Sequence, residues 1–338
     1  MTSSLSQQIL NRKRRAIARL ITYVENNHPK AQQALSELYP HTGQAHLVGV
    51  TGAPGTGKSS LVNEIAKAYR RQDISVAILA IDPTSPFSGG AILGDRIRMR
   101  ELTGDPGVFI RSMASRGNLG GLARAAHDAI KVLDAAGFEV ILIETVGAGQ
   151  SEVEIARTAH TVLVVEAPGL GDDIQAIKAG ILEIADIFVV NKADRPGADK
   201  TAATLKTMLE LGRNKTQQIM HHGALMTINN PLPPSQDDNN PGWQIPVIQT
   251  IALKGDGVEG LMAAISNHRQ RLIDSGELSK RNRARLADEL EALLQAELMR
   301  RLTVHVPAET LSDIIAKLVA RSLSPYNAMQ IILEDYCS

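Results

Sequence analysis

The chain has 338 residues, enough for one large α/β domain with extensions or for two ordinary domains. Its 36 Lys and Arg residues balance 36 Asp and Glu residues, and zero net charge argues against a dedicated nucleic-acid or membrane-surface protein. The single cysteine, Cys337, excludes a disulfide framework and a cysteine-based metal cluster. We therefore expect a cytoplasmic protein whose partner is another protein or a small molecule.

The first 43 residues are expected to form a helical extension of two helices, separated at His28-Pro29. An apolar stripe from Leu5 to Val24 recurs at helical spacing, which favours a helix docked on the following domain. The Arg12 to Arg15 run is then expected to be the solvated face of this helix. A mitochondrial transit peptide is the alternative, because no acidic residue precedes Glu25.

A glycine-rich turn with the complete GxxxxGK[ST] pattern follows the first apolar run, at residues 46–51. Its glycines let backbone N–H groups converge on phosphate oxygens, and the helix that follows adds a positive end. Lys58 would reach the outer phosphates, and Ser59 would offer its hydroxyl to Mg²⁺. An ordinary turn between a strand and a helix is the alternative. The expected nucleotide-binding residues of this loop are Gly52, Ala53, Pro54, Gly55, Thr56, Gly57, Lys58, Ser59 and Ser60.

Short β-branched runs alternate with helical stretches after this loop. Near-continuous apolar strands separated by helices imply a parallel sheet covered on both faces. We therefore predict an α/β fold, a P-loop NTPase with a mostly parallel sheet and with N- and C-terminal helical extensions. The expected strands are 74–81, 108–111, 139–143, 161–166, 187–190 and 247–251, and helices are expected at 119–136 and 201–220.

Three acidic residues are candidates for the metal and the attacking water. Asp82 and Glu144 each end an apolar strand, although Asp82 could also be a turn residue, and Asp95 is the third acid. One Mg²⁺ does not need three acids as direct ligands. At least one of the three is therefore expected to hold a metal ligand or position a water instead, and the sequence does not decide which one. Gly147 could donate its N–H to the γ-phosphate. Ala148 takes the place of the water-orienting Gln of small signalling GTPases, so unaided hydrolysis should be slow.

The tetrapeptide Asn191-Lys192-Ala193-Asp194 follows another strand and predicts guanine specificity. The Asp194 carboxylate can accept from N1–H and the 2-amino group of guanine, whereas adenine lacks that pair of donors. Lys192 would cover the base plane, and Asn191 would tie the loop together. A polar turn is the alternative, but the position after a phosphate loop in the same sheet strengthens the motif. The run 250–254, from Thr250 to Lys254, ends the last strand and is a weaker candidate for the remaining base loop, with Ala252, Leu253 and Lys254 as its expected nucleotide-binding residues.

The segment 168–174 follows the strand 161–166 and should emerge at the ligand edge of the sheet. Its two glycines allow more than one backbone conformation, and its acids can respond to the phosphate state. The simpler alternative is a helix N-cap. We therefore expect this segment to report the nucleotide state to a partner.

The chain becomes wholly helical from Ser279, with leucine-rich stripes that predict core packing or, equally, a subunit interface. Ser324-Pro325 should cap and begin a last helix. The expected domains are a helical extension at 1–43, a P-loop GTPase domain at 44–275 and a helical dimerisation region at 276–338. The run 229–246 is expected to be a solvated loop.

Together these motifs resemble the ArgK/MeaB family of P-loop GTPases, the G-proteins that chaperone adenosylcobalamin-dependent methylmalonyl-CoA mutase. The resemblance covers nearly the whole chain, and the most specific stretches are ETVGAGQSE and PGLGDDIQAIKAG. It implies Mg²⁺ and GTP or GDP as ligands, a homodimer, and the mutase as partner. It places Lys58, Asp82, Asp95 and Glu144 at nucleotide- and metal-handling positions. The residues that it implies for coupling to the mutase are Gly169, Gly171, Asp172, Asp173 and Gln175.

The sequence departs from the family at Arg116, Asn118 and Ala167-Pro168, which affects the expected tuning of the partner response rather than nucleotide binding. Two other functions are open to a chain of this kind. A kinase linked to an arginine/ornithine transport system should carry a base for an acceptor hydroxyl, and none is evident. A metal-insertion GTPase needs His or Cys clusters, but His221-His222 is expected on a helix, where neighbouring side chains diverge.

Overall fold

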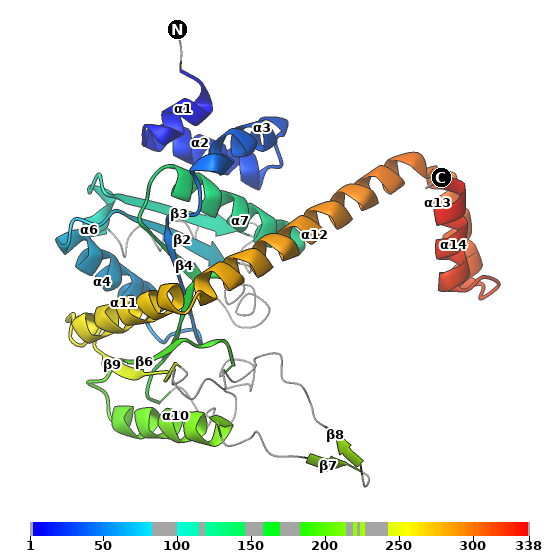
Figure 1. The fold of residues 1–338 in the computed structure, drawn as a ribbon. Coiled ribbons are helices and arrows are strands. Elements are labelled where there is room, and N and C mark those ends of the chain that lie inside the picture. Colours follow the sequence, from blue (N-terminus) through cyan, green and yellow to red (C-terminus); the bar gives the residue numbers. More distant parts are fainter. Residues whose placement is uncertain are drawn as a thin grey trace. The chain divides into compact units, whose positions relative to one another are not determined.

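The computed structural model describes residues 3–82, 100–114, 119–145, 158–169, 183–213, 219–221, 224–226 and 243–336. The chain forms two compact units, Met1–Ser275 and Gly276–Ser338, and each is described by itself. Figure 1 labels most of their helices and strands. Among the described helices, none is long and apolar enough to cross a membrane.

A seven-stranded sheet with strand order β3-β2-β4-β1-β5-β6-β9 forms the centre of the first unit. All its neighbouring strands pair in parallel, which confirms the α/β prediction. Because every strand runs the same way, the loops after their carboxyl ends meet at one edge. The strands are β1 (His46–Thr51), β2 (Val76–Asp82), β3 (Val108–Ala114), β4 (Val140–Thr145), β5 (Thr161–Glu166), β6 (Ile187–Asn191) and β9 (Val247–Thr250).

Helices cover both faces of this sheet (Figure 1). Successive strand residues point to opposite faces, so Leu142 packs with the α4 side of the core and Ile141 with the α7 side. Both faces are therefore apolar, as a parallel sheet requires. One face carries α4 (Lys58–Arg71) and α11 (Val258–Asp274), and the other carries α7 (Leu119–Ala135) and α10 (Ala198–Arg213).

The N-terminal extension contains three helices, not the two that were predicted. The predicted break at His28-Pro29 is confirmed, and His28 Nδ1 accepts from the Lys30 N–H at 3.1 Å. A further turn at Arg12, whose φ is +54°, separates the first two helices. The helices are α1 (Leu5–Leu10), α2 (Arg14–Glu25) and α3 (Pro29–Leu38), followed by the short η1 (Tyr39–His41). α2 packs against α7 and buries an apolar face between them.

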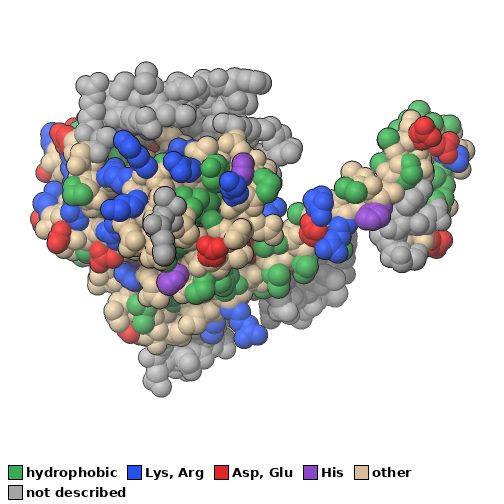
Figure 2. All heavy atoms as spheres, turned by 90° about the horizontal axis from the view of Figure 1, so that it is seen from above, with side chains coloured by type: hydrophobic (Ala, Val, Ile, Leu, Met, Phe, Trp, Pro, Cys, Tyr) green, Lys and Arg blue, Asp and Glu red, His purple; other side chains and the backbone are tan. Residues whose placement is uncertain are grey.

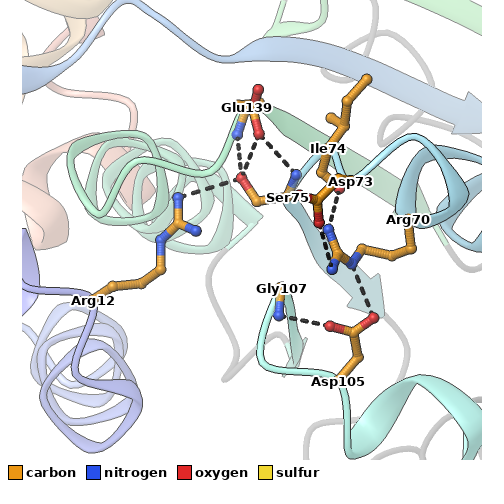
Figure 3. Close-up of polar contacts among 8 residues, drawn as sticks. All are labelled: Arg12, Arg70, Asp73, Ile74, Ser75, Asp105, Gly107 and Glu139. Carbon is orange, nitrogen blue, oxygen red and sulfur yellow. Dashed lines mark hydrogen bonds and ion pairs between the residues drawn. The ribbon is translucent and has the colours of Figure 1, made fainter.

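Arg12 connects this extension to the sheet, although all four residues of the Arg12 to Arg15 run are exposed, as predicted. Its guanidinium donates to the carbonyls of Ala136 (3.1 Å) and Gly137, and lies 4.9 Å from the centre of the Phe138 ring. It also approaches Ser75 Oγ at 3.3 Å (Figure 3). The left-handed turn at Arg12 brings its side chain within reach of these partners. The apolar periodicity of the sequence does not predict these contacts.

Charged side chains also organise the amino edge of the sheet, opposite the predicted nucleotide loops (Figure 3). Arg70 donates to Asp105 at 2.9 Å and to the Ile74 carbonyl at 3.0 Å. The hydrogen bond from Arg70 holds the pKa of Asp105 below its usual value. Glu139 accepts from the Ser75 N–H at 2.9 Å, which lowers the pKa of Glu139. These contacts join the starts of β2, β3 and β4.

A chain of buried polar side chains joins β1, β5 and α11 at the same edge. Thr161 Oγ lies 3.0 Å from His46 Nε2 and 2.9 Å from His268 Nδ1. His268 Nε2 lies 3.3 Å from an Asp186 carboxylate oxygen. Because an ionised carboxylate only accepts, His268 Nε2–H donates to Asp186 and leaves Nδ1 as an acceptor. The Thr161 hydroxyl then donates to His268, and His46 Nε2–H donates to Thr161.

His46 should make the folded protein sensitive to acid. Burial, with a smaller contribution from the nearby charge of Arg269, lowers its pKa from 6.5 to about 2. Above pH 6.5 His46 is neutral in both states and has no effect. Between pH 6.5 and 2 only the unfolded chain binds the proton, so the free energy of unfolding should fall by about 1.4 kcal/mol per pH unit.

Urea unfolding of the wild type and of His46→Gln at pH 7.5 and 5.5 measures this effect, because Gln keeps an N–H donor but does not titrate. The wild type should lose about 1 kcal/mol more than the variant on acidification. Equal losses in the two proteins would show that His46 is protonated in the folded state or contributes nothing.

Part of the predicted helix 201–220 is wrong. α10 ends at Arg213, and residues 219–221 form β7 (Ile219–His221), which pairs antiparallel with β8 (Ala224–Met226). His221 therefore lies on a strand and not on a helix. Of the expected loop 229–246, only residues 243–246 are described, and they have no regular structure.

The second unit is wholly helical, as predicted. It contains α12 (Glu277–His305), α13 (Ala308–Val319) and α14 (Pro325–Tyr336). Ser324 caps α14 by accepting from the Asn327 N–H at 3.2 Å. α12 buries none of its own residues. Its exposed apolar side chains are Leu286, Leu290, Leu293, Leu294, Leu298, Met299 and Val304.

Candidate nucleotide site

The predicted phosphate loop connects β1 to α4 at the carboxyl edge of the sheet. Gly52, Gly55 and Gly57 all have positive φ, at 137°, 82° and 93°. A side chain at Gly52 would collide with the backbone of Val165 in the neighbouring strand β5. Gly57 is the N-cap of α4, so the loop leads directly into the helix N-terminus. The turn therefore depends on its glycines, and its backbone is available to an anion.

Lys58 begins α4 and folds back over the loop. Its amine donates to the carbonyls of Gly52 (2.6 Å) and Ala53 (3.0 Å), and the side chain is buried. Thr56 Oγ also donates to the Ala53 carbonyl, at 2.9 Å. Pro54 and Gly55 form the exposed tip of the loop. A positive charge is thus held inside a turn of backbone groups.

Ser59 and Glu144 meet at the same edge although they are 85 residues apart in sequence. The Ser59 hydroxyl donates to a Glu144 carboxylate oxygen at 2.6 Å. Glu144 is 1% exposed, and Ser60 is half-buried beside Ser59. The buried carboxylate adds negative charge where a cation could be held, and both partners offer oxygen, the ligand that Mg²⁺ prefers.

The other predicted acids are partly beyond what the structure describes. Asp82 is the last residue of β2 and Glu144 the last but one of β4, and the register pairs Ala80 with Glu144, so both acids lie at the carboxyl ends of neighbouring strands. Asp95 and Gly147 lie outside the described residues. Of the predicted metal-handling residues, the described part of the structure therefore brings Ser59 and Glu144 into contact.

The NKAD tetrapeptide contacts the phosphate loop from the end of β6. Asn191 Nδ2 donates to the Thr56 carbonyl at 2.8 Å. Lys192, at a φ of +58°, donates through Nζ to the Gly55 carbonyl at 2.6 Å. The Asp194 side chain is exposed. Two adjacent residues thus hold the loop from one side while the carboxylate stays open to solvent.

Asn191 also binds the loop after β9. Its Oδ1 accepts from the Ala252 N–H at 3.0 Å and from Thr250 Oγ at 3.2 Å. Ala252 is buried, whereas Leu253 is 90% exposed and Lys254 is exposed. One amide therefore connects three loops at this edge. Thr250 belongs to the run 250–254 that the sequence suggests for the base loop, and its hydroxyl donates to Asn191.

The predicted coupling segment is described only at its beginning. Pro168 is buried, and Gly169 is exposed with a φ of +76°. Gly171, Asp172, Asp173 and Gln175 lie outside the described residues. Within the parts of the chain that the structure describes, no group of three or more His, Cys, Asp or Glu side chains is arranged to hold a metal ion.

Comparison with known proteins agrees with this site. The family model described as "Methylmalonyl Co-A mutase-associated GTPase MeaB" matches residues 17–306. A putative GTPase of Pyrococcus horikoshii is 47% identical over 95% of this chain and 94% of its own. The mouse mitochondrial protein named "Methylmalonic aciduria type A homolog" is 29% identical over 96% of this chain and 77% of its own.

A crystal structure described as "LAO/AO transport system kinase" has the same fold. Its TM-score is 0.69 and its identity 24%, and the match covers 99% of this chain and 97% of that one. The family match spans both the phosphate loop and the NKAD motif, the two elements that Asn191 joins. The chain therefore belongs to the MeaB family and is a P-loop GTPase.

Proposed function

We propose that this GTPase acts as a chaperone of adenosylcobalamin-dependent methylmalonyl-CoA mutase, supporting the loading or protection of its cofactor. The observation that carries this proposal is the match to a family described as mutase-associated, over residues 17–306. The relative named for methylmalonic aciduria is consistent with it. The proposal has three parts, which concern the nucleotide, the partner and the oligomer.

The triphosphate is proposed to bind at the loop between β1 and α4. Lys58 would leave the carbonyls of Gly52 and Ala53 for the outer phosphates, since phosphate oxygens are stronger acceptors than neutral carbonyls. Ser59 and Glu144 suit Mg²⁺ because they supply adjacent oxygen atoms, one of them charged. The ion would neutralise charge on the phosphates during hydrolysis. Further roles for Asp82, Asp95 and Gly147 at this centre are proposed from the sequence alone.

Guanine is proposed to bind between the NKAD motif and the loop of Ala252, Leu253 and Lys254. The contacts of Asn191 to both loops support this, because they bring the two base-binding segments to the phosphate loop. Lys192 is drawn toward Gly55 and would cover one face of the base. The exposed carboxylate of Asp194 would accept from the base edge.

The Asp194→Asn variant should prefer xanthosine triphosphate to GTP. An amide can donate to the 2-oxo group of xanthine, whereas a carboxylate repels it and accepts from guanine instead. We expect at least a tenfold change in the ratio of the two affinities, which corresponds to about 1.4 kcal/mol. Competitive binding of labelled nucleotides measures the ratio. A variant that ranks the two nucleotides as the wild type does would refute the base assignment.

The segment with Gly169, Gly171, Asp172, Asp173 and Gln175 is proposed to couple nucleotide state to the mutase. It follows β5, whose neighbour β1 leads into the phosphate loop. Since Ala148 leaves no water-orienting Gln, turnover should depend on a partner that completes the site. The mutase is therefore expected to raise the GTPase rate.

GTP turnover with and without purified methylmalonyl-CoA mutase tests this coupling. Replacing Asp172 and Asp173 by Ala should reduce the stimulation more than the intrinsic rate, whereas Glu210→Ala, which removes an exposed acid on α10, should leave both unchanged. Equal stimulation of the double variant and the wild type would exclude the loop from coupling. No stimulation of any of the proteins would count against the mutase itself.

The second unit is proposed to pair two subunits. α12 exposes leucines along its length, and α13 and α14 add exposed Val319, Tyr326 and Met329. Apolar surface of this extent, beside only three buried apolar residues (Val306, Ile314 and Ala328) in the described part of the unit, favours self-association. Sedimentation of the wild type should therefore give a dimer.

A further inference from the structure

The N-terminal helical layer, residues 3–41, carries an unbalanced positive charge. It contains six Lys or Arg residues and two acids in a protein whose net charge is zero. Both acids are engaged within the protein. Glu25 forms an ion pair with Arg111 of β3, and Glu37 accepts from Ser6 at 2.6 Å and from Gln33 at 3.1 Å. Glu25 is therefore compensated by Arg111, and Glu37 is the one acid of the layer that no described cation pairs with.

The cations of the layer differ in what they contact. Arg12 and Arg14 donate to backbone carbonyls, which accept hydrogen bonds but do not cancel charge. The other four are exposed and form no ion pair with any residue that the structure describes. These four residues, which we call the basic face, are Lys13, Arg15, Arg19 and Lys30. In Figure 2 Lys and Arg side chains gather on the side of the first unit that this layer covers.

The positions of the basic face on α2 are electrostatically unfavourable for the helix itself. Lys13 is the N-cap of α2, it makes no capping hydrogen bond, and the first turn of α2 contains no acid. Cations at the positive end of a helix are unfavourable. Arg15 and Arg19 are four residues apart, so they lie on one side of α2 and repel each other. Folding therefore does not account for these charges, whereas a negatively charged partner would.

We propose that the basic face is a docking surface for an acidic protein surface. Arginines are enriched in protein interfaces, and their guanidinium groups bind carboxylates in pairs of hydrogen bonds. A membrane is disfavoured because α2 buries its apolar side chains against α7 and has none left to insert. A nucleic acid is disfavoured because the rest of the chain carries the compensating negative charge.

Binding of a fluorescein-labelled peptide of Glu residues at low ionic strength tests this surface. The variant Arg15→Glu/Arg19→Glu should bind at least tenfold more weakly than the wild type. The matched variant Lys200→Glu/Lys206→Glu, which reverses two exposed charges on α10, should bind within about twofold of the wild type. Salt should weaken the wild-type complex, since the contacts are between charges in water.

The same assay with duplex DNA and with phosphatidylserine vesicles separates the classes of partner. Equal peptide binding by the two double variants would overturn the basic face as a site. Tighter, Arg15- and Arg19-dependent binding of DNA or vesicles would overturn the assignment to a protein partner. Glu at position 15 lies in the first turn of α2, where it favours the helix, and circular dichroism of the double variant shows whether it is folded. The proposal is independent of the mutase, so its outcome leaves the proposed function untouched.

Discussion

The Lys58→Ala substitution is expected to lower GTP turnover by about 10²–10³-fold. In the free protein its amine is held by the carbonyls of Gly52 and Ala53, so the charge is already oriented within the phosphate loop. No other Lys or Arg of this loop can replace it. Its loss removes the charge that would stabilise the transferring phosphoryl group. Single-turnover hydrolysis and GTP affinity, measured together, show whether the substitution slows the hydrolysis step or weakens GTP binding.

Two controls accompany this prediction. Lys200→Ala removes an exposed cation from α10 and should hydrolyse GTP at the wild-type rate. Lys58→Arg should be as inactive as Lys58→Ala, because the larger, planar guanidinium does not fit the space that the compact ammonium of Lys58 occupies. Circular dichroism should show that Lys58→Ala is folded. A folded variant with unchanged turnover would exclude the loop as the phosphate site.

The Gly52→Ala substitution should have the largest effect on stability. Its Cβ would lie 3.0 Å from the Val165 carbonyl carbon and closer still to the oxygen, and neither can move without breaking β5. Gly52 also has a φ of +137°, where a side chain is strained. We expect the free energy of unfolding to fall by about 2–4 kcal/mol and GTP affinity to fall with it.

Gly55→Ala is the matched comparison. Gly55 also has a positive φ, +82°, but a Cβ there meets no atom within 4 Å. The cost should therefore be limited to the left-handed backbone, about 1 kcal/mol. Denaturant unfolding of both variants measures the difference. If the two lose equal stability, the close approach of Gly52 to β5 does not constrain the loop.

Much of the fold could be predicted because its signals are local. The strands of the sheet are short apolar runs, and the phosphate loop is a contiguous motif between a strand and a helix. The break at His28-Pro29 and the cap at Ser324 follow from residue types at adjacent positions. The NKAD motif and the family resemblance likewise depend on contiguous residues, so no knowledge of the tertiary structure was needed.

Errors arose where a non-local partner overrides the local pattern. Arg12 is exposed, as its run predicts, but it also donates to carbonyls more than 120 residues away, which the run does not predict. The helical signal of 201–220 continues past Arg213, whereas residues 219–221 pair with β8 instead. Strand pairing and burial depend on what lies opposite, and a single sequence does not contain that information.

The sequence by itself determined the class of fold, the two nucleotide motifs and the family, because each depends on residues that are close together in the sequence. Only the tertiary structure decided that Glu144 meets Ser59, that Asn191 joins the phosphate loop to Ala252, and that Thr161 links two buried histidines. These contacts join residues that are 61 to 135 positions apart in the sequence. The physical reason is that strand order and register determine which distant residues meet. Packing of the whole sheet determines the order and the register.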